Sequence, residues 1–452
     1  MKITFLGGTE TVTGSKYLIE TKSTKVLIDC GLYQGYKNLR ERNWQPLPFD
    51  LSSLDAIFLT HAHIDHSGYI PLLYKQGYRG PIFTHHATKE LCKILLIDSG
   101  HIQEADARFY KKYKLSKHAV PLPLYDKATA ESSMALFKSV DYLETFSVGD
   151  IKAHLQSAGH ILGAASIIVK AEGKTVGFSG DVGRPDDFFM KPADPLPELD
   201  LLLLESTYGN RRHKDSDPFQ QLADIINETV KEGGTLLIPS FAVGRAQALQ
   251  HMLASLMKEK RIPKLPIYLD SPMAISVSDI YCRYQDELRL DKQDCINMSE
   301  TTTYTREVEE SKAIASQQYP HIIIAGSGMA TGGRILHHFK RLLSNYRTRV
   351  LFTGYQAGGT RGAKMLDGTE DVKIHGQWIR VKAKVEVLDG LSGHADYMDI
   401  ANWLKQSSLR SNMPIQLVHG DPSALEGMRD HLRKTTSFEV EIATYKSSIF
   451  LL

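Results

Sequence analysis

Four side chains that can bind a metal ion stand within six consecutive positions of this chain. They are His61, His63, Asp65 and His66, and they stand just past the apolar segment 56–59. Histidine makes up only 18 of the 452 residues, so chance explains three histidines at fixed offsets beside an acid poorly. An apolar run that ends in a turn is typical of a β-strand and its loop. The string therefore predicts a sheet in which one strand end gathers these side chains.

The types of ligand in this string indicate one kind of chemistry. Neutral imidazole and carboxylate are the groups that hold zinc in catalytic sites, where one coordination position stays open. On a turn, His61 and His63 can face one way while Asp65 and His66 face the other, which suits two metal ions side by side. A run of surface or capping histidines is the alternative, and it leaves the spacing unexplained.

Three further candidate ligands follow later apolar segments. Each stands beside a glycine at an expected strand end: His160, Asp181 and His419. Glycine allows a backbone to approach a crowded centre closely. Taken alone, each of these residues would more often be a hydrogen-bonded structural side chain. Together with the first string, they favour a complete site for two metal ions.

The composition is that of a folded protein, with 42% hydrophobic and 23% charged residues. A length of 452 residues suggests two or three domains. No segment approaches the roughly 20 apolar residues of a membrane span, and the apolar start, Met1–Gly8, is too short for a signal peptide. We therefore expect a cytoplasmic protein without a membrane partner. Since Cys30, Cys92, Cys282 and Cys295 lack any C-x-x-C spacing, we interpret all four as thiols.

Changes of rhythm along the chain predict a domain inserted into another. Short apolar runs dominate residues 1–207, apart from a mainly helical stretch from Lys89 to about Phe146. Helices and strands alternate over residues 208–374, which is typical of a separate α/β domain with a largely parallel sheet. Residues 375–452 return to the earlier style, with a strand expected at Val385–Leu388. We expect this last segment to complete the first domain.

The candidate ligands, with Leu27–Gly31 upstream of them, resemble the successive motifs of the metallo-β-lactamase superfamily. The resemblance implies an αββα sandwich that holds two Zn²⁺ ions. It assigns one zinc to three histidines: His61, His63 and His160. It assigns the other to Asp65, His66 and His419. Asp181 would bridge the two ions, and Asp29 would orient a ligand without binding metal.

Two further motifs select a branch of that superfamily. Glu205 stands at an expected strand end just before the inserted segment, and His394 follows that segment. With His419, this order is similar to that of the β-CASP family of nucleic-acid nucleases, in its RNA-processing branch. The similarity spans essentially the whole chain, including the glycine-rich strings 326–333 and 354–360. It implies a metallo-β-lactamase sandwich with an inserted α/β β-CASP domain, and catalytic roles for Asp65, Glu205 and His394.

A basic stretch lies inside the expected insertion. Residues 326–364 contain seven basic side chains and no acid, although the formal net charge of the whole chain is only +2. A phosphate backbone is the natural partner for such a stretch, while a solvated helix face is the alternative. We expect RNA contacts from five of these side chains: Arg334, Lys340, Arg341, Arg349 and Arg361. Ser392 resembles a family position that touches the substrate phosphate.

These observations together predict a zinc-dependent ribonuclease that acts on single-stranded RNA. Two alternatives stay open: a small-molecule thioester or lactam hydrolase on the same metal platform, and a nonenzymatic RNA-binding scaffold. A small-molecule hydrolase would not be expected to have the pair Glu205 and His394, and a nonenzymatic scaffold would not be expected to keep all the metal ligands. Internal cleavage, cleavage from the 5′ end and assembly as a homodimer all remain compatible with the sequence.

Overall fold

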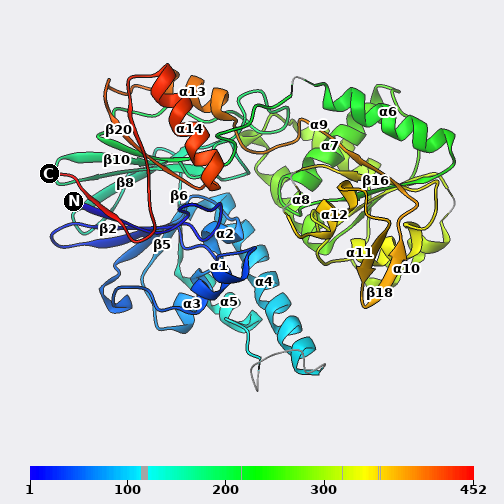
Figure 1. Cartoon of the computed structure of the whole chain (residues 1–452), viewed down its shortest axis with the longest axis horizontal. Coiled ribbons are helices and arrows are strands. Elements are labelled where there is room, and N and C mark those ends of the chain that lie inside the picture. The colour runs from blue at the N-terminus through cyan, green and yellow to red at the C-terminus, as the bar shows by residue number, and fades with distance from the viewer. Residues whose placement is uncertain (113–120, 215, 318, 355, 357) are drawn as a thin grey trace. The chain divides into compact units, whose positions relative to one another are not determined.

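The computed structural model describes residues 1–112, 121–214, 216–317, 319–354, 356 and 358–452. Contacts divide the chain into two compact units (Figure 1). The first unit joins Met1–Arg212 to Gly393–Leu452, and the second is His213–Ser392. The second unit ends at Ser392, later than the expected 374. The extension includes the last strand of its sheet, which the sequence had placed in the returning segment.

Two sheets build the first unit. Among the described residues, one has the order β22 (Ser448–Phe450), β1 (Lys2–Gly7), β2 (Lys16–Glu20), β3 (Lys25–Ile28), β4 (Ala56–Phe58), β5 (Ile82–His85) and β6 (Phe137–Val140). The other has the order β21 (Glu439–Ile442), β20 (Pro414–Val418), β11 (Leu201–Glu205), β10 (Lys174–Phe178), β9 (Ala165–Ala171), β8 (Ile151–Ser157) and β7 (Phe146–Val148). Alternating residues of both sheets meet in one buried core, which includes Phe58, Ile167 and Leu203.

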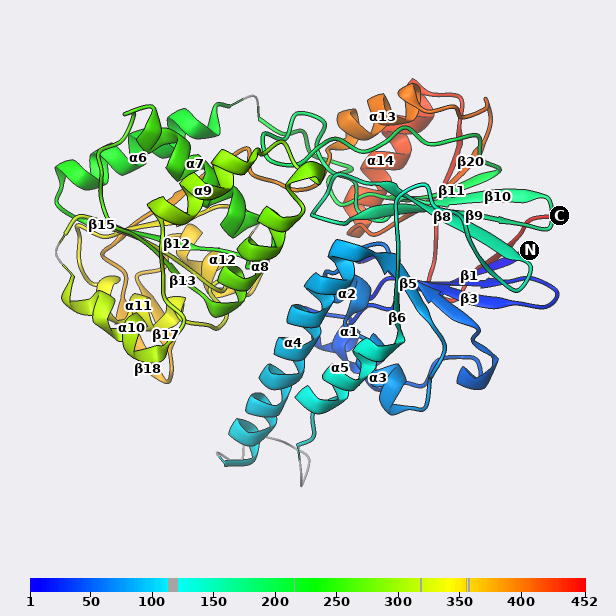
Figure 2. The same ribbon diagram turned by 180° about the vertical axis from the view of Figure 1, so that it is seen from behind.

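Helices cover the outer faces of this sandwich. On the first sheet these are α1 (Lys37–Glu41), α2 (Ile64–Ser67), α3 (Ile70–Lys75), α4 (His86–Lys112) and α5 (Lys127–Ser133). On the second sheet they are α13 (Tyr397–Gln406) and α14 (Pro422–Thr435) (Figures 1 and 2). The αββα layering expected from the sequence is therefore confirmed. The stretch expected to be helical up to Phe146 instead ends in β6, and part of it, 113–120, lies outside the described residues.

The second unit is an α/β domain, as expected. Its main sheet has the order β14 (Thr303–Tyr304), β13 (Ile267–Asp270), β15 (His321–Ala325), β12 (Thr235–Pro239), β16 (Arg349–Phe352) and β19 (Lys384–Val387), and these neighbours are all parallel. Strands β17 (Asp371–Ile374) and β18 (Gln377–Arg380) form a separate hairpin. The helices are α6 (Pro218–Lys231), α7 (Arg245–Lys258), α8 (Pro272–Arg283), α9 (Lys292–Thr301), α10 (Val308–Ala313), α11 (Ile335–Leu342) and α12 (Arg361–Leu366).

The cysteines differ from the sequence interpretation in one respect. Cys30 and Cys92 are buried thiols, as expected. Cys282 and Cys295, by contrast, form a disulfide, because helices α8 and α9 bring their Cα atoms to 5.7 Å, within the range that a disulfide spans. The spacing of the two cysteines along the chain does not predict how these helices pack. Among the described helices, none combines the length and the apolar character that crossing a bilayer requires.

Candidate metal centre

Strand ends of both sheets in the first unit bring the seven candidate ligands together. His61 and His63 lie in the turn after β4, and Asp65 and His66 lie in the short helix α2 that follows it. His160, Asp181 and His419 follow β8, β10 and β20. Backbone contact at this edge is very close, since a Cβ on Gly31 would lie 1.5 Å from the carbonyl oxygen of Asp65. Glycine at position 31 therefore permits the turn to pack against the loop after β3. His419 itself has a φ of 51°, a left-handed conformation that is costly for histidine.

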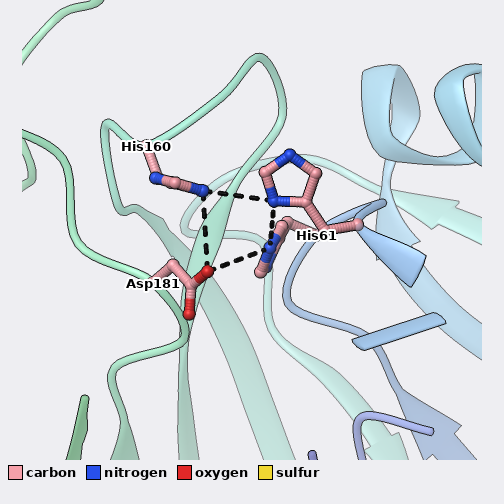
Figure 3. A group of neighbouring side chains, drawn as sticks. His61, His160 and Asp181 are labelled. Atoms are coloured by element: carbon pink, nitrogen blue, oxygen red, sulfur yellow. Dashed lines mark hydrogen bonds and ion pairs between the residues drawn. The ribbon is translucent and has the colours of Figure 1, made fainter. Parts of the chain in front are cut away.

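Four donor atoms form a first set around an enclosed point. His61 Nε2 lies 3.1 Å from His63 Nδ1, which lies 3.2 Å from His160 Nε2. Oδ2 of Asp181 completes the set, at 3.4 Å from His61 Nε2 and 3.5 Å from His160 Nε2. Figure 3 shows the side chains of His160 and Asp181 turned toward His61. Of these atoms, three are nitrogens of histidines and one is a carboxylate oxygen.

A second set stands on the other side of the same carboxylate. His66 Nε2 lies 3.1 Å from His419 Nε2 and 3.3 Å from Oδ1 of Asp181. Oδ2 of Asp65 lies 3.5 Å from His419 Nε2 and 4.0 Å from His66 Nε2. Asp181 thus offers one oxygen to each set, and it is itself only 2% exposed.

The two sets have the spacing that a tetrahedral ion requires. Two donor atoms that each lie about 2.0 to 2.1 Å from a tetrahedral zinc are roughly 3.3 Å apart, and most separations here are 3.1 to 3.5 Å. Oδ1 of Asp181 is buried without a hydrogen-bond partner in the described structure. Such an orphaned oxygen is costly unless something binds it. A pair of cations fits these residues.

An outer layer of hydrogen bonds aims the imidazoles of His61 and His66. Oδ2 of Asp29 lies 2.7 Å from Nδ1 of His66, which makes that nitrogen the donor and turns the Nε2 lone pair into the site. The hydroxyl of Thr60 donates to Asp29 and lies 3.1 Å from Nδ1 of His61. The backbone N–H of Thr60 also donates to Asp29. Asp29 thus lies beside His66 and is not a member of either donor set.

Two further contacts of this kind were not anticipated. Nδ1 of His160 donates to the carbonyl oxygen of Gly393 at 2.8 Å, which leaves Nε2 as the ligand atom. Nδ1 of His419 lies 3.2 Å from the hydroxyl of Thr207. Thr60 adjoins His61 and Thr207 lies close to Glu205, so their closeness to these motifs could have singled out both threonines. The Gly393 carbonyl carried no signal at all, since every residue has one.

Glu205 and His394 form an acid–histidine pair beside the first set. Oε1 of Glu205 accepts from the backbone N–H of Val182 at 2.7 Å and lies 3.2 Å from Nδ1 of His394. The ring of His394 is 4.4 Å from that of His160, centroid to centroid. Burial alone would lower the pKa of His394, but the charge and hydrogen bond of Glu205, followed by the charges of Asp181 and Asp65, raise that pKa to about 9. Glu205 therefore favours the protonated form of His394.

The side chains expected to bind RNA differ in their exposure and in their contacts within the protein. Arg349 is a correction: it is 1% exposed and forms ion pairs with Glu228, Glu232 and Glu386, so it cannot reach an RNA phosphate. The sequence did not indicate this, because the three acids that pair with Arg349 lie far from it along the chain.

The remaining basic candidates differ in what they contact. The guanidinium of Arg334 donates to Asp270 and to two backbone carbonyls, and that of Arg361 donates to three backbone carbonyls. Arg341 is exposed on α11, with Lys340 half-buried beside it. Ser392 is half-buried at the end of the second unit.

Known proteins match the chain along most of its length. The metallo-beta-lactamase superfamily matches residues 11–218, the Beta-Casp domain residues 246–365, and the Zn-dependent metallo-hydrolase RNA specificity domain residues 378–443. Ribonuclease TTHA0252 of Thermus thermophilus is 35% identical over 94% of this chain and 94% of its own length. Transcription termination factor FttA of Methanosarcina mazei is 30% identical over 100% of this chain and 72% of its own length. A protein of unknown function from Enterococcus faecalis shares the fold, with a TM-score of 0.56 at 12% identity over 100% of this chain and 99% of its own.

Proposed function

We propose that this chain, which belongs to the β-CASP family of the metallo-β-lactamase superfamily, is a zinc-dependent ribonuclease. Its reaction is the hydrolysis of phosphodiester bonds in single-stranded RNA. The observation that carries the proposal is the pair of donor sets that share Asp181, with the Glu205–His394 pair beside them. The RNA specificity domain matched at residues 378–443 and the ribonuclease relative support RNA as the substrate. We also propose the cytoplasm as the compartment of this reaction.

Two zinc ions are the metals that we assign to the two sets. His61, His63 and His160 would hold one ion, and Asp65, His66 and His419 the other, with Asp181 between them. Nitrogen-rich sets completed by carboxylates suit zinc better than magnesium or calcium, which prefer oxygen ligands. Bound zinc lowers the pKa of water and offsets negative charge on a phosphoryl group, which is the chemistry that hydrolysis of a phosphodiester needs.

The residues of the chain then divide the remaining work. His394 gives its proton to the oxygen that leaves the phosphorus, and a positively charged imidazolium near neutral pH suits that role. Glu205 holds His394 by its Nδ1, so that the ring keeps its charge and its direction. Asp65, 21% exposed, lies at the more open side of the second set and helps to position the attacking group there.

Digestion of end-labelled single-stranded RNA tests this function. The full chain loaded with zinc should produce fragments over a time course, the chelated chain should not, and adding zinc back should restore cleavage. Parallel substrates with a 5′-phosphate and a 5′-hydroxyl separate internal cleavage from cleavage that begins at the 5′ end. RNA binding without any cleavage by the zinc-loaded chain would overturn the proposal in favour of a scaffold, and turnover of a thioester without RNA cleavage would favour a small-molecule hydrolase.

A further inference from the structure

A second candidate site lies on the outer face of the β7–β11 part of the second sheet. A pocket of about 550 Å³ opens there, within the range of small-molecule sites. Its wall includes Lys152 and His154 from β8, Lys170 from β9 and Thr175 from β10. These strands run side by side (Figure 2). The neighbours of these residues, such as Ala153 and Val169, point into the sandwich core, so the four side chains face outward.

Two lysines stand directly opposite each other in this pocket. Lys152 pairs with Lys170 across β8 and β9, and Lys170 pairs with Thr175 across β9 and β10. Like charges in directly opposed positions destabilise a sheet. Neither lysine forms an ion pair with any residue in the described part of the chain. Both lysines are exposed, and neither has an acidic partner among the described residues, although Glu198 and Asp200 also line the pocket.

The first sheet shows how the same chain compensates such a row. There Glu20 stands between Lys2 and Lys25 across three strands, with contacts of 2.9 Å and 3.3 Å. The row in the second sheet differs, because its two lysines lie on adjacent strands and Thr175 is the next residue across. An anion bound against both Lys152 and Lys170 would supply the negative charge that Glu20 supplies in the first sheet.

The acids at the pocket do not fill that place. Asp200 accepts from the backbone N–H of Thr175 at 2.7 Å and pairs with Arg410 at 2.8 Å, so its charge is already met. Glu198 is exposed and makes no ion pair with either lysine among the described residues. His154, half-buried next to the row, has its pKa lowered by burial and can act as a neutral hydrogen-bonding group.

The other wall of the pocket is apolar. Ile168 and Leu199 line this wall. Both belong to the hydrophobic cluster that helices α13 and α14 form with the outer face of the sheet. Pro197 lines the same side. A ligand with a phosphate on one end and a flat, less polar group on the other would match both walls.

We propose that this pocket binds a small phosphate monoester the size of a mononucleotide, with its phosphate between Lys152 and Lys170. Lys152 stands five residues before Ser157, the end of β8 that leads to His160. At about 3.3 Å per residue this places it roughly 17 Å along the strand from that end. The pocket is thus separate from the metal centre, and the proposal stands whether or not the chain cleaves RNA.

Calorimetry on the full zinc-loaded chain tests the proposal, with adenosine 5′-monophosphate and inorganic phosphate as probes. We expect the nucleotide to bind more tightly than phosphate. Lys152→Ala and Lys170→Ala should each weaken it by about tenfold, because each removes a charged hydrogen-bond donor. Lys138→Ala is the matched control, since Lys138 is an exposed strand lysine on the other sheet. Thermal unfolding of each variant checks that it is folded.

Lys170→Glu gives an independent readout without any ligand. It should abolish nucleotide binding and raise the midpoint of thermal unfolding, because it recreates the lysine–acid arrangement of the first sheet. Unchanged affinity in the Lys152→Ala, Lys170→Ala double variant would overturn the proposal. Equal affinity for phosphate and nucleotide would overturn its nucleotide part, and binding of a 5′-phosphorylated RNA but not of the mononucleotide would show that the site reads RNA instead.

Discussion

The two units each bury a cluster of charged and polar side chains at strand ends, but the clusters differ in how they are satisfied. In the first unit, histidine nitrogens approach one another to 3.1 Å, and Oδ1 of Asp181 has no hydrogen-bond partner in the described structure. In the second unit, Asp270 ends β13 and is fully buried. Both clusters offer a carboxylate and histidine in an apolar setting, which by itself does not identify a metal site.

The cluster around Asp270 is complete without any added ion. One oxygen accepts from Thr305 and Arg334, and the other from Ser311 and His338, all at 2.6 to 2.7 Å. Four donors therefore hold the carboxylate and lower its pKa against the opposing effect of burial. The difference teaches that a buried acid whose lone pairs are filled by the protein is a structural link, whereas one left with an orphaned oxygen among facing nitrogens is built for a cation.

Asp181→Ala should have the largest effect on this comparison. The variant removes one carboxylate oxygen from each donor set, so we expect zinc affinity to fall by more than about 100-fold, beyond the effect of losing a residue that only orients a ligand. RNA cleavage should be lost with it. Zinc content by mass spectrometry and cleavage of labelled RNA are the two measurements. A variant that keeps the wild-type zinc content would remove Asp181 from the metal centre.

His394→Ala should separate chemistry from metal binding. We expect cleavage to fall by about 10²- to 10⁴-fold, the usual contribution of a positioned acid, while zinc content stays that of the wild type. Glu205→Gln is the matched variant: it removes the charge that raises the pKa of His394 and should give a smaller loss. Normal turnover in zinc-loaded His394→Ala would contradict the proton-donor assignment.

Asp270→Ala tests the other cluster. It leaves Arg334 and His338 without their acid, and removing one partner of a buried ion pair costs about 3 to 5 kcal/mol. We expect the transition of the second unit in urea to move to lower concentration while zinc content is unchanged. Asp224→Ala, an exposed acid on α6, is the control and should have little effect. Loss of zinc in Asp270→Ala would contradict the conclusion that the Asp270 cluster is structural and binds no metal.

Thr207→Val should give a smaller change at the metal centre. It removes the hydroxyl beside Nδ1 of His419 while keeping the shape of the side chain. Partners that orient a ligand typically contribute 10- to 100-fold in metal affinity. Competition with a zinc chelator measures this, and we expect only one of the two zinc equivalents to be affected. If both equivalents keep their affinity, Thr207 does not orient His419.

Arg341→Ala should have the smallest effect and concerns the exposed side chains of the second unit. Whereas Arg349 is fully engaged by acids, Arg341 is exposed on α11. One lost phosphate contact should lower the slope of log affinity against log salt by about one. RNA binding at several salt concentrations measures it. An unchanged slope would place the RNA path elsewhere.

The fold class could be predicted because periodicity along the chain reports it directly. Strand–helix alternation predicted the inserted α/β domain, and the resemblance of the motifs to a known family implied the sandwich. That resemblance is confirmed by the matches along the chain. The strand expected at Val385–Leu388 is present as β19, but its place in the sheet of the second unit was missed, because local sequence does not identify β16 as its pairing partner. The disulfide between Cys282 and Cys295 was missed for the same reason.

For the candidate centre, the sequence by itself determined which side chains were available: histidines and acids beside glycines at strand ends, in an order that few folds share. Only the tertiary structure decided how each was used. It set the oxygens of Asp181 between two sets of nitrogens and surrounded Asp270 with donors, although both are acids at strand ends. It also neutralised Arg349 with acids from distant elements. The physical reason is that the use of a charged group depends on which partners folding brings within a few ångströms, and those partners lie far away along the chain.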